Sequence, residues 1–300
     1  MEIRTLRYFL VVAREESFTR AAEQLFISQP TLSKQLKSLE EELGKKLFVR
    51  HSFSVELTEE GRLLRTLAED MITLEEKIKS SIRTLEDVTG RDVYLGLPDS
   101  YQVRYVARII KELKESYPNL HYHITSGDTL QVTDSLDKGI LDFAVLVEPP
   151  NYDKYNSLML PLADYFGLIM QADDELAKNE YITIDDLVGL PLFCSEQSWK
   201  ADITRWCGNR INELKLEGSY HLPYNASMFT KEGLGYLLTF ENLIDTSEKN
   251  GLVFRLLKPK LECKMYLIWK KNIKLSPIAQ RFLDKFISSI NNMGQENGNG

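Results

Sequence analysis

The chain has 300 residues and a formal net charge of −7, with 43% hydrophobic residues, 27% charged residues and three cysteines. This length is enough for two or three domains that each bury a core, and the composition is typical of a globular protein and not of a disordered one. No apolar run approaches the roughly 20 residues of a membrane span, and three cysteines do not make a disulfide framework in a chain of this size.

The first informative pattern is residues 18–42, FTRAAEQLFISQPTLSKQLKSLEEE, in which two helical patterns meet at a polar break. The first helix has a small, apolar face made of Ala21, Ala22 and Leu25. The second has Ser28 as a candidate N-cap and Pro30 in its first turn. Its apolar stripe is Leu32, Leu36 and Leu39. The spacing predicts a helix-turn-helix.

The opposite face of the second helix carries amides, hydroxyls and lysines, which can read base edges and neutralise phosphates in a major groove. The candidate DNA contacts on this helix are Ser28, Gln29, Pro30, Thr31, Ser33, Lys34 and Lys37. A structural helical hairpin with a solvated polar face is the alternative, because similar patterns occur in proteins that bind no DNA.

A short β pattern follows Gly44, and residues 47–49 and 55–57 are expected to pair as a wing along the DNA backbone or minor groove. Arg50 is a candidate phosphate ligand, and an exposed arginine with no special role is the alternative. Residues 1–58 hold nine basic and eight acidic side chains, a charge of +1, whereas residues 91–300 hold 23 and 28, a charge of −5. Most of the negative charge therefore lies away from the proposed DNA face.

A long helix is expected after Thr58, with Glu59 and Glu60 in its first turn. Its apolar positions recur at spacings of three and four: Leu64, Leu67, Met71, Leu74, Ile78, Ile82 and Leu85. Such a stripe over about six turns favours a coiled-coil seam between two chains, because a lone helix would leave it in water. Packing onto the rest of the same chain is the alternative.

Beyond Val93, short apolar runs alternate with helical stretches, which is typical of α/β units. Strands are expected at residues 93–97, 121–125, 143–147, 166–170, 192–194, 235–239 and 265–269. Helices are expected at residues 103–117, 130–138, 184–187, 199–213 and 276–291.

Residues 1–65 resemble the DNA-binding domain of LysR-type transcriptional regulators through LRYFLVVAREESFTRAAEQLFISQPTLSKQLKSLEEELGKKLFVR and the later LTEEG. LDFAVL, KEGLGYLL and LSPIAQRFLDKF fall where effector domains of that family have similar strings. The resemblance implies an N-terminal all-α winged helix-turn-helix, a long linker helix, and a C-terminal α/β two-lobed domain like periplasmic binding proteins. Many members carry an arginine at the wing tip, where this chain has Phe53.

The expected domains are residues 1–58 for the winged helix-turn-helix, 59–90 for the dimerisation helix and 91–293 for the effector domain, with a disordered tail at 294–300. Lobe I should comprise about 91–162 and 266–293, and lobe II about 163–265. The family resemblance implies a homodimer or homotetramer that binds double-stranded operator DNA and responds to a small-molecule effector. The start Met1-Glu2-Ile3-Arg4 is unlike a secretory signal, so we expect a cytoplasmic location.

In domains of this kind, ligands bind between the lobes where strands end and helices begin. The expected effector contacts are Pro98, Asp99, Ser100, Thr129, Val147, Cys194, Ser195, Asn225 and Met228. Free N–H groups at helix starts favour an anionic ligand, whereas Asp99 favours a cationic or polyhydroxylated one. For each hydroxyl, capping of its own helix is the alternative.

Other function classes have weaker support in the sequence. Cys194, Cys207 and Cys263 lack a motif that marks a reactive thiolate, although a cysteine-based redox sensor stays an alternative. His121 and His123 share a strand face without a third ligand at metal-binding spacing, and no nucleotide-binding or hydrolase motif is present. We expect no metal, no cofactor and no catalysis. A constitutive repressor whose second domain serves only for assembly is the main alternative to an effector-responsive regulator.

Overall fold

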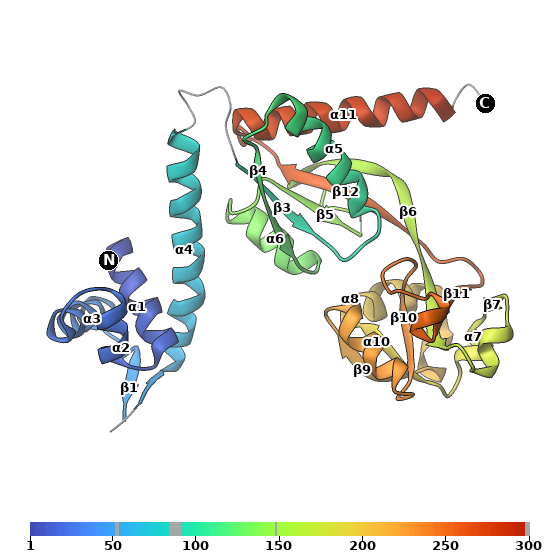
Figure 1. Ribbon diagram of the computed structural model, residues 1–300, viewed down its shortest axis with the longest axis horizontal. Coiled ribbons are helices and arrows are strands. Elements are labelled where there is room, and N and C mark those ends of the chain that lie inside the picture. Colours follow the sequence, from blue (N-terminus) through green and yellow to red (C-terminus); the bar gives the residue numbers. More distant parts are fainter. Residues whose placement is uncertain (52–53, 84–91, 148, 298–300) are drawn as a thin grey trace. The chain divides into compact units, whose positions relative to one another are not determined.

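The computed structural model describes residues 1–51, 54–83, 92–147 and 149–297. The chain forms two compact units, Met1–Glu86 and Asp87–Gly300, called here the N-terminal unit and the C-terminal unit. Helices and one small hairpin make up the first, and strands with covering helices make up the second (Figure 1). Within the described ranges, no helix is long and apolar enough to cross a membrane.

The N-terminal unit has the predicted helix-turn-helix. Its elements are α1 (Ile3–Glu15), α2 (Phe18–Gln24), α3 (Gln29–Leu43), β1 (Phe48–Arg50), β2 (Val55–Leu57) and α4 (Glu59–Arg83). The Ser28 hydroxyl accepts the Thr31 amide hydrogen at the start of α3, as the sequence predicts. Gly44 ends α3 at φ +65°, a left-handed conformation that glycine adopts without steric strain.

The apolar faces of α2 and α3 build the core of this unit. Leu32, Leu36 and Leu39 are buried, and Ala21 and Ala22 let the two helices approach closely. Burying one leucine side chain stabilises a fold by about 1.5–3 kcal/mol, so this stripe determines which face of α3 stays in solvent.

The wing is an antiparallel hairpin in which Phe48 lies opposite Leu57 and Arg50 opposite Val55, which confirms the predicted pairing. Phe53, expected at its tip, lies outside the described residues.

The linker helix α4 is amphipathic, and part of its apolar surface packs within its own unit. Leu64 and Ala68 contact the core formed by α1, α2 and α3. Arg7 of α1 donates to Glu75 and Glu76 at 2.8 and 3.0 Å. The large apolar side chains that stay exposed on α4 are Leu63, Leu67, Met71, Ile78 and Ile82. Leu85, the last residue of the predicted seam, lies outside the described residues.

The C-terminal unit has two lobes that share one long strand. Its strands are β3 (Asp92–Leu97), β4 (His121–Ser126), β5 (Phe143–Leu146), β6 (Tyr155–Gln171), β7 (Tyr181–Ile182), β8 (Pro191–Ser195), β9 (Lys215–Tyr220), β10 (Tyr236–Phe240), β11 (Leu252–Leu257) and β12 (Glu262–Lys270). Lobe I has the order β4-β3-β5-β12-β6, and in lobe II β6 continues to β10, β8 and β9. β6 pairs with β12 up to Tyr165 and with β10 from Phe166 onward, so it passes from one lobe into the other.

Helices cover both sheets. They are α5 (Val103–Ser116), α6 (Thr129–Asp137), α7 (Ile184–Leu187), α8 (Glu196–Ser198), α9 (Thr204–Cys207), α10 (Pro223–Lys231) and α11 (Pro277–Asn297). Among the described residues, four further segments are 3₁₀- or π-helical: η1 (Glu175–Lys178), η2 (Trp199–Ile203), η3 (Gly208–Glu213) and η4 (Glu248–Asn250). In lobe I, α5 and α11 pack together through Tyr105 and Phe286, whose ring centroids are 5.1 Å apart.

Two expectations about this unit were wrong, and several of its elements were not predicted. Residues 199–213 form η2, α9 and η3 instead of one helix, because Gly208 has φ +56° and interrupts the helical path. Residues 294–297 continue α11 instead of starting a disordered tail, since one glycine costs a helix only about 1 kcal/mol. Strands β7, β9 and β11 and helix α10 were not predicted. β9 alternates exposed and half-buried side chains and lacks an apolar run, whereas β11 has such a run, which the prediction passed over.

Candidate functional site

The solvent face of α3 presents the side chains predicted to contact DNA. Gln29, Pro30, Thr31, Lys34 and Lys37 are all exposed. Within the described ranges, the side chains of Gln29 and Lys34 have no hydrogen-bond or ion-pair partner. Their amide and ammonium groups are therefore free to bind an external acceptor or donor.

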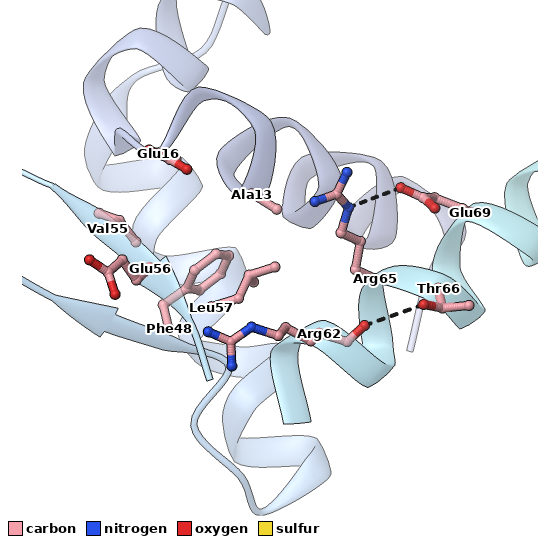
Figure 2. Close-up of a pocket in the computed structure, with 10 residues that line it drawn as sticks. All are labelled: Ala13, Glu16, Phe48, Val55, Glu56, Leu57, Arg62, Arg65, Thr66 and Glu69. Atoms are coloured by element: carbon pink, nitrogen blue, oxygen red, sulfur yellow. Dashed lines mark hydrogen bonds and ion pairs between the residues drawn. The ribbon is translucent and has the colours of Figure 1, made fainter. Parts of the chain in front are cut away.

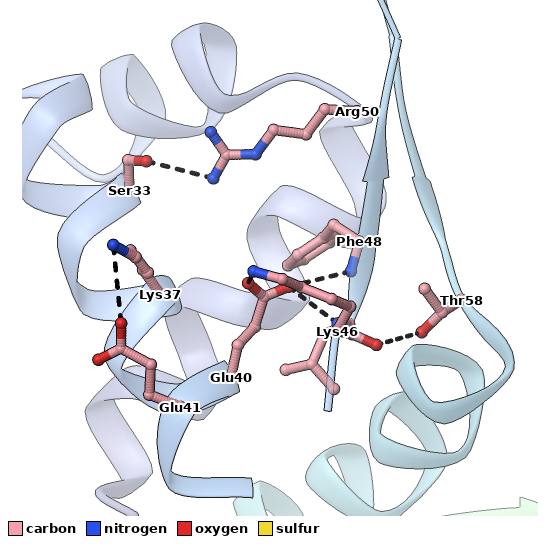
Figure 3. A network of polar contacts seen from close by, with 9 residues as sticks. Ser33, Lys37, Glu40, Glu41, Lys46, Phe48, Arg50 and Thr58 are labelled. Atoms are coloured by element: carbon pink, nitrogen blue, oxygen red, sulfur yellow. Dashed lines mark hydrogen bonds and ion pairs between the residues drawn. The ribbon is translucent and has the colours of Figure 1, made fainter. Parts of the chain in front are cut away.

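Arg50 joins the wing to this face (Figure 3). Its Nη2 donates to Ser33 Oγ at 3.2 Å, and its guanidinium carbon lies 4.3 Å from the centroid of the Phe18 ring. In the described residues no carboxylate pairs with Arg50, so its positive charge remains available for a phosphate.

A buried carboxylate sets the position of the wing relative to α3. Glu40 Oε1 accepts the amide hydrogens of Leu47 and Phe48 at 2.9 and 3.4 Å, and Oε2 accepts from Lys46 Nζ at 2.9 Å (Figure 3). Burial acts to raise the pKa of Glu40, but the hydrogen bonds from Leu47 and Lys46 outweigh it and lower that pKa.

The sequence analysis gave Glu40 no role. Its place four residues after Leu36, on the buried stripe, is the signal that would have found its role.

The N-terminal unit also contains an open hollow of about 630 Å³ between α1, the wing and α4 (Figure 2). Its charged lining has three carboxylates, Glu16, Glu56 and Glu69, and two guanidinium groups, Arg62 and Arg65. Arg65 Nε donates to Glu69 Oε1 at 3.1 Å. All five charged residues are exposed, so this hollow has the character of an open surface groove.

A second cavity, of about 430 Å³, lies between the two lobes of the C-terminal unit. Lobe I contributes Pro98, Asp99, Ser126, Gly127, Asp128, Gln131 and Val147. Lobe II contributes Phe166, Ser195, Glu196, Gln197, Ser198, Tyr220, His221, Leu222, Pro223, Thr239, Phe240 and Leu243. This volume is in the range of small-molecule sites, and the mixture of aromatic walls and a few polar groups is typical of them.

Two hydrogen bonds connect the lobes beside this cavity. The Thr129 amide donates to Gln197 Oε1 at 3.0 Å, and Gln197 Nε2 donates to Thr129 Oγ1 at 2.9 Å. Thr129 begins α6 in lobe I and Gln197 lies on α8 in lobe II. These two hydrogen bonds, called here the interlobe bridge, therefore form only when the two lobes are close together at this edge.

Both units match known families. Residues 3–62 match the model of bacterial regulatory helix-turn-helix proteins of the lysR family, and residues 87–289 match the LysR substrate binding domain. The chain belongs to the LysR family. It is a DNA-binding transcriptional regulator with an effector-binding domain, and regulators of this family bind DNA and small-molecule effectors as oligomers.

Two relatives of this LysR regulator come from Bacillus subtilis (strain 168). The uncharacterized HTH-type transcriptional regulator YcgK is 35% identical over 306 residues, which cover 95% of this chain and 93% of YcgK. The uncharacterized regulator YwbI is 29% identical over 293 residues and 95% of each chain. The crystal structure of CbnR, a LysR family transcriptional regulator, has a TM-score of 0.75 at 18% identity, with 96% of this chain and 99% of CbnR covered. That last likeness concerns the fold.

The predicted effector residues of this LysR regulator are placed unequally. Pro98, Asp99, Val147 and Ser195 line the interlobe cavity. Thr129 is engaged in the interlobe bridge at its edge.

The other four predicted effector residues do not line the cavity, and the structure corrects their placement. Ser100 Oγ donates to the buried Asp164 at 2.6 Å, so it stabilises the start of α5. Cys194 is fully buried in β8. Asn225 and Met228 lie on α10, which reaches the cavity only through Pro223. The sequence analysis missed Tyr220, His221 and Thr239 because β9 went unrecognised and the register of β10 was not known.

The three cysteines of this LysR regulator are free and buried. Burial raises the pKa of Cys207 to about 11 and also raises the pKa of Cys194 and of Cys263. Thiols of this kind stay protonated at neutral pH, which is the opposite of a reactive thiolate. Their environment therefore disfavours the redox-sensor alternative.

Proposed function

We propose that this LysR regulator binds its effector in the interlobe cavity and that the ligand acts by changing the arrangement of the lobes. The single observation that carries the proposal is a cavity whose wall comes from both lobes and which lies beside the interlobe bridge. A ligand there touches both lobes at once, so it binds one arrangement better than another. A preference of about 1–3 kcal/mol is enough to couple effector binding to operator geometry.

On the DNA side, the proposal gives Gln29, Thr31 and Lys34 contacts in the major groove, because they occupy the exposed first turns of α3. Lys37 and Arg50 would contact phosphates, while Ser28, Pro30 and Ser33 hold the helix start and Arg50 in place.

Two copies would pair through the exposed apolar side chains of α4, which supports binding to a roughly palindromic operator. The regulator would act on DNA in the cytoplasm and catalyse no reaction.

The test is a thermal-shift screen of metabolites on the full chain, followed by footprinting of the operator with each stabilising compound. Val147→Trp should fill the cavity and remove both the thermal shift and the change in footprint. Val188→Trp is the matched control, since Val188 is an exposed valine outside the cavity lining. A compound that alters the footprint equally in both variants would locate the effector elsewhere. Operator binding that ignores every stabilising compound would favour the constitutive-repressor alternative.

A further inference from the structure

The charged groups that line the interlobe cavity are mainly carboxylates. Besides Tyr220, its ionisable lining is Asp99, Asp128, Glu196 and His221, and no lysine or arginine of the described residues lines it. Asp128 accepts the Gln131 amide hydrogen at 2.9 Å, and Glu196 pairs with Lys200 at 3.0 Å. In the same ranges, the Asp99 carboxylate has neither a hydrogen bond nor an ion pair. One carboxylate therefore faces the cavity uncompensated.

Three backbone donors at the helix starts beside the cavity are already bonded. The Thr129 amide donates to Gln197, the Gln131 amide to Asp128, and the Ser198 amide to Ser195 Oγ at 3.2 Å. An anionic ligand would have to displace these acceptors and also approach Asp99. These three amides are therefore not free for an anionic effector, which weakens the case for an anion at the helix starts.

The Tyr220 hydroxyl is engaged within the protein. It donates to Leu238 O at 2.9 Å, and its oxygen accepts from the Thr239 hydroxyl and the Ser195 amide. Phe166, Phe240 and Leu243 give the same cavity an apolar wall. Burial without an opposite charge raises the pKa of Asp99, which is the mark of a charge that a cation would stabilise.

We propose that the effector of this site is an organic cation, a primary or secondary ammonium on an apolar body, whose N–H groups pair with Asp99. This inference rests on the proposed function, in which the interlobe cavity is the effector site. The ammonium supplies the missing charge, and its body packs against the aromatic wall.

The experiment is calorimetric titration of the full-length protein with two pairs of probes that differ only in charge type. The amines are phenethylamine and hexylamine, and their partners are 3-phenylpropanoate and heptanoate. For at least one pair, the amine should bind about tenfold or more tightly than its carboxylate. Asp99→Asn should weaken that amine about tenfold, whereas Asp173→Asn, the same change at an exposed aspartate outside the cavity lining, should leave its affinity within about twofold.

Three results would overturn the cationic assignment: carboxylates that bind at least as tightly as the amines, amine affinity unchanged in Asp99→Asn, or no amine binding to the wild type up to about 10 mM. Unfolding curves of Asp99→Asn, recorded beside the titrations, separate lost affinity from lost structure. Val147→Trp separates the two proposals. If carboxylates bind and this variant abolishes their binding, the cavity is the ligand site and only the charge assignment fails. If probes bind Val147→Trp as well as the wild type, the interlobe site itself is wrong.

Discussion

Two polar side chains of the recognition helix are free, whereas the hydroxyl groups around the interlobe cavity are engaged within the protein. Gln29 and Lys34 project from α3 without partners in the described ranges. Ser100, Thr129 and Ser195 each hold a backbone amide or another side chain of their own chain. The difference has a physical cause. A helix start leaves N–H groups that nearby polar side chains bind first, and at the start of α3 Ser28 takes this role and leaves the Gln29 side chain free, whereas Lys34 lies past the first turn, where the helix satisfies its own backbone.

The comparison teaches which predicted residues to expect at a binding site. A polar residue on the exposed face of a helix keeps its hydrogen-bonding capacity for a partner. A hydroxyl in a loop before a helix usually binds the free amides of that helix. The groups available to a ligand are then those that the loop leaves unpaired, here Asp99. The following variants test that contrast, from the largest expected effect to the smallest.

The largest effect should come from charge in the exposed stripe of α4. Met71 and Ile78 are 38% and 49% exposed. Met71→Lys with Ile78→Lys should give monomers, because a charged lysine at either position opposes burial against a second chain. Loss of the second half-site contact should weaken operator binding by about 10²–10⁴-fold. Sedimentation and gel-shift titration measure both effects. Thr66→Lys with Thr73→Lys, at exposed polar positions of the same helix, is the control. Dimers that persist through α4 in the first variant would contradict the seam.

Glu40→Ala should destabilise the N-terminal unit by about 2–4 kcal/mol, because two buried amides lose their acceptor. Hydrogen exchange at the Leu47 and Phe48 amides measures this directly, and Glu41→Ala, an exposed neighbour, should leave it unchanged.

The contribution of Glu40 should also depend on pH. Since its folded-state pKa is lowered, the stabilisation is present above the ordinary carboxyl pKa and is lost as the pH falls through the folded-state value. Protection of Leu47 and Phe48 that is the same at low and neutral pH would count against this role.

On the free face of α3, Gln29→Ala and Lys34→Ala should have effects of different kinds. Loss of a bidentate amide contact should relax base preference at one position of each half-site by about 1–3 kcal/mol. Loss of the ammonium should weaken all sequences alike and reduce the salt slope by about one per chain. Binding-site selection at two salt concentrations distinguishes them. If neither variant changes affinity or preference, α3 is not the reading helix.

The smallest effect should come from the interlobe bridge. Gln197→Ala removes two hydrogen bonds to Thr129 and should shift the equilibrium between lobe arrangements by about 1 kcal/mol. Without ligand, the small-angle scattering profile of the full chain and the operator footprint should both differ slightly from those of the wild type. An effector should reverse both differences. Lys200→Ala, on the exposed side of the same segment, should change neither. A footprint identical to the wild type would mean that the bridge does not contribute to coupling.

The recognition helix was predictable because its information is local. Helical periodicity, the Ser28 cap and Gly44 give the bounds and buried face of α3 from consecutive residues. The buried role of Glu40 was within reach of the same periodicity. Four of the nine predicted effector residues line the cavity because strand ends can be read from the sequence.

The sequence by itself determined the two-part architecture, the helix-turn-helix, the exposed face of α3 and the approximate positions of the loops that leave β3 and β8, all of which follow from residues near one another in the chain. Only the tertiary structure decided that Gln197 meets Thr129, that Ser100 turns toward Asp164, and that Asp99 shares a cavity with Tyr220. These contacts join residues more than 60 positions apart. They depend on how β6 carries the chain between the lobes and on which backbone amides the nearby side chains satisfy first, and neither can be read from local spacing.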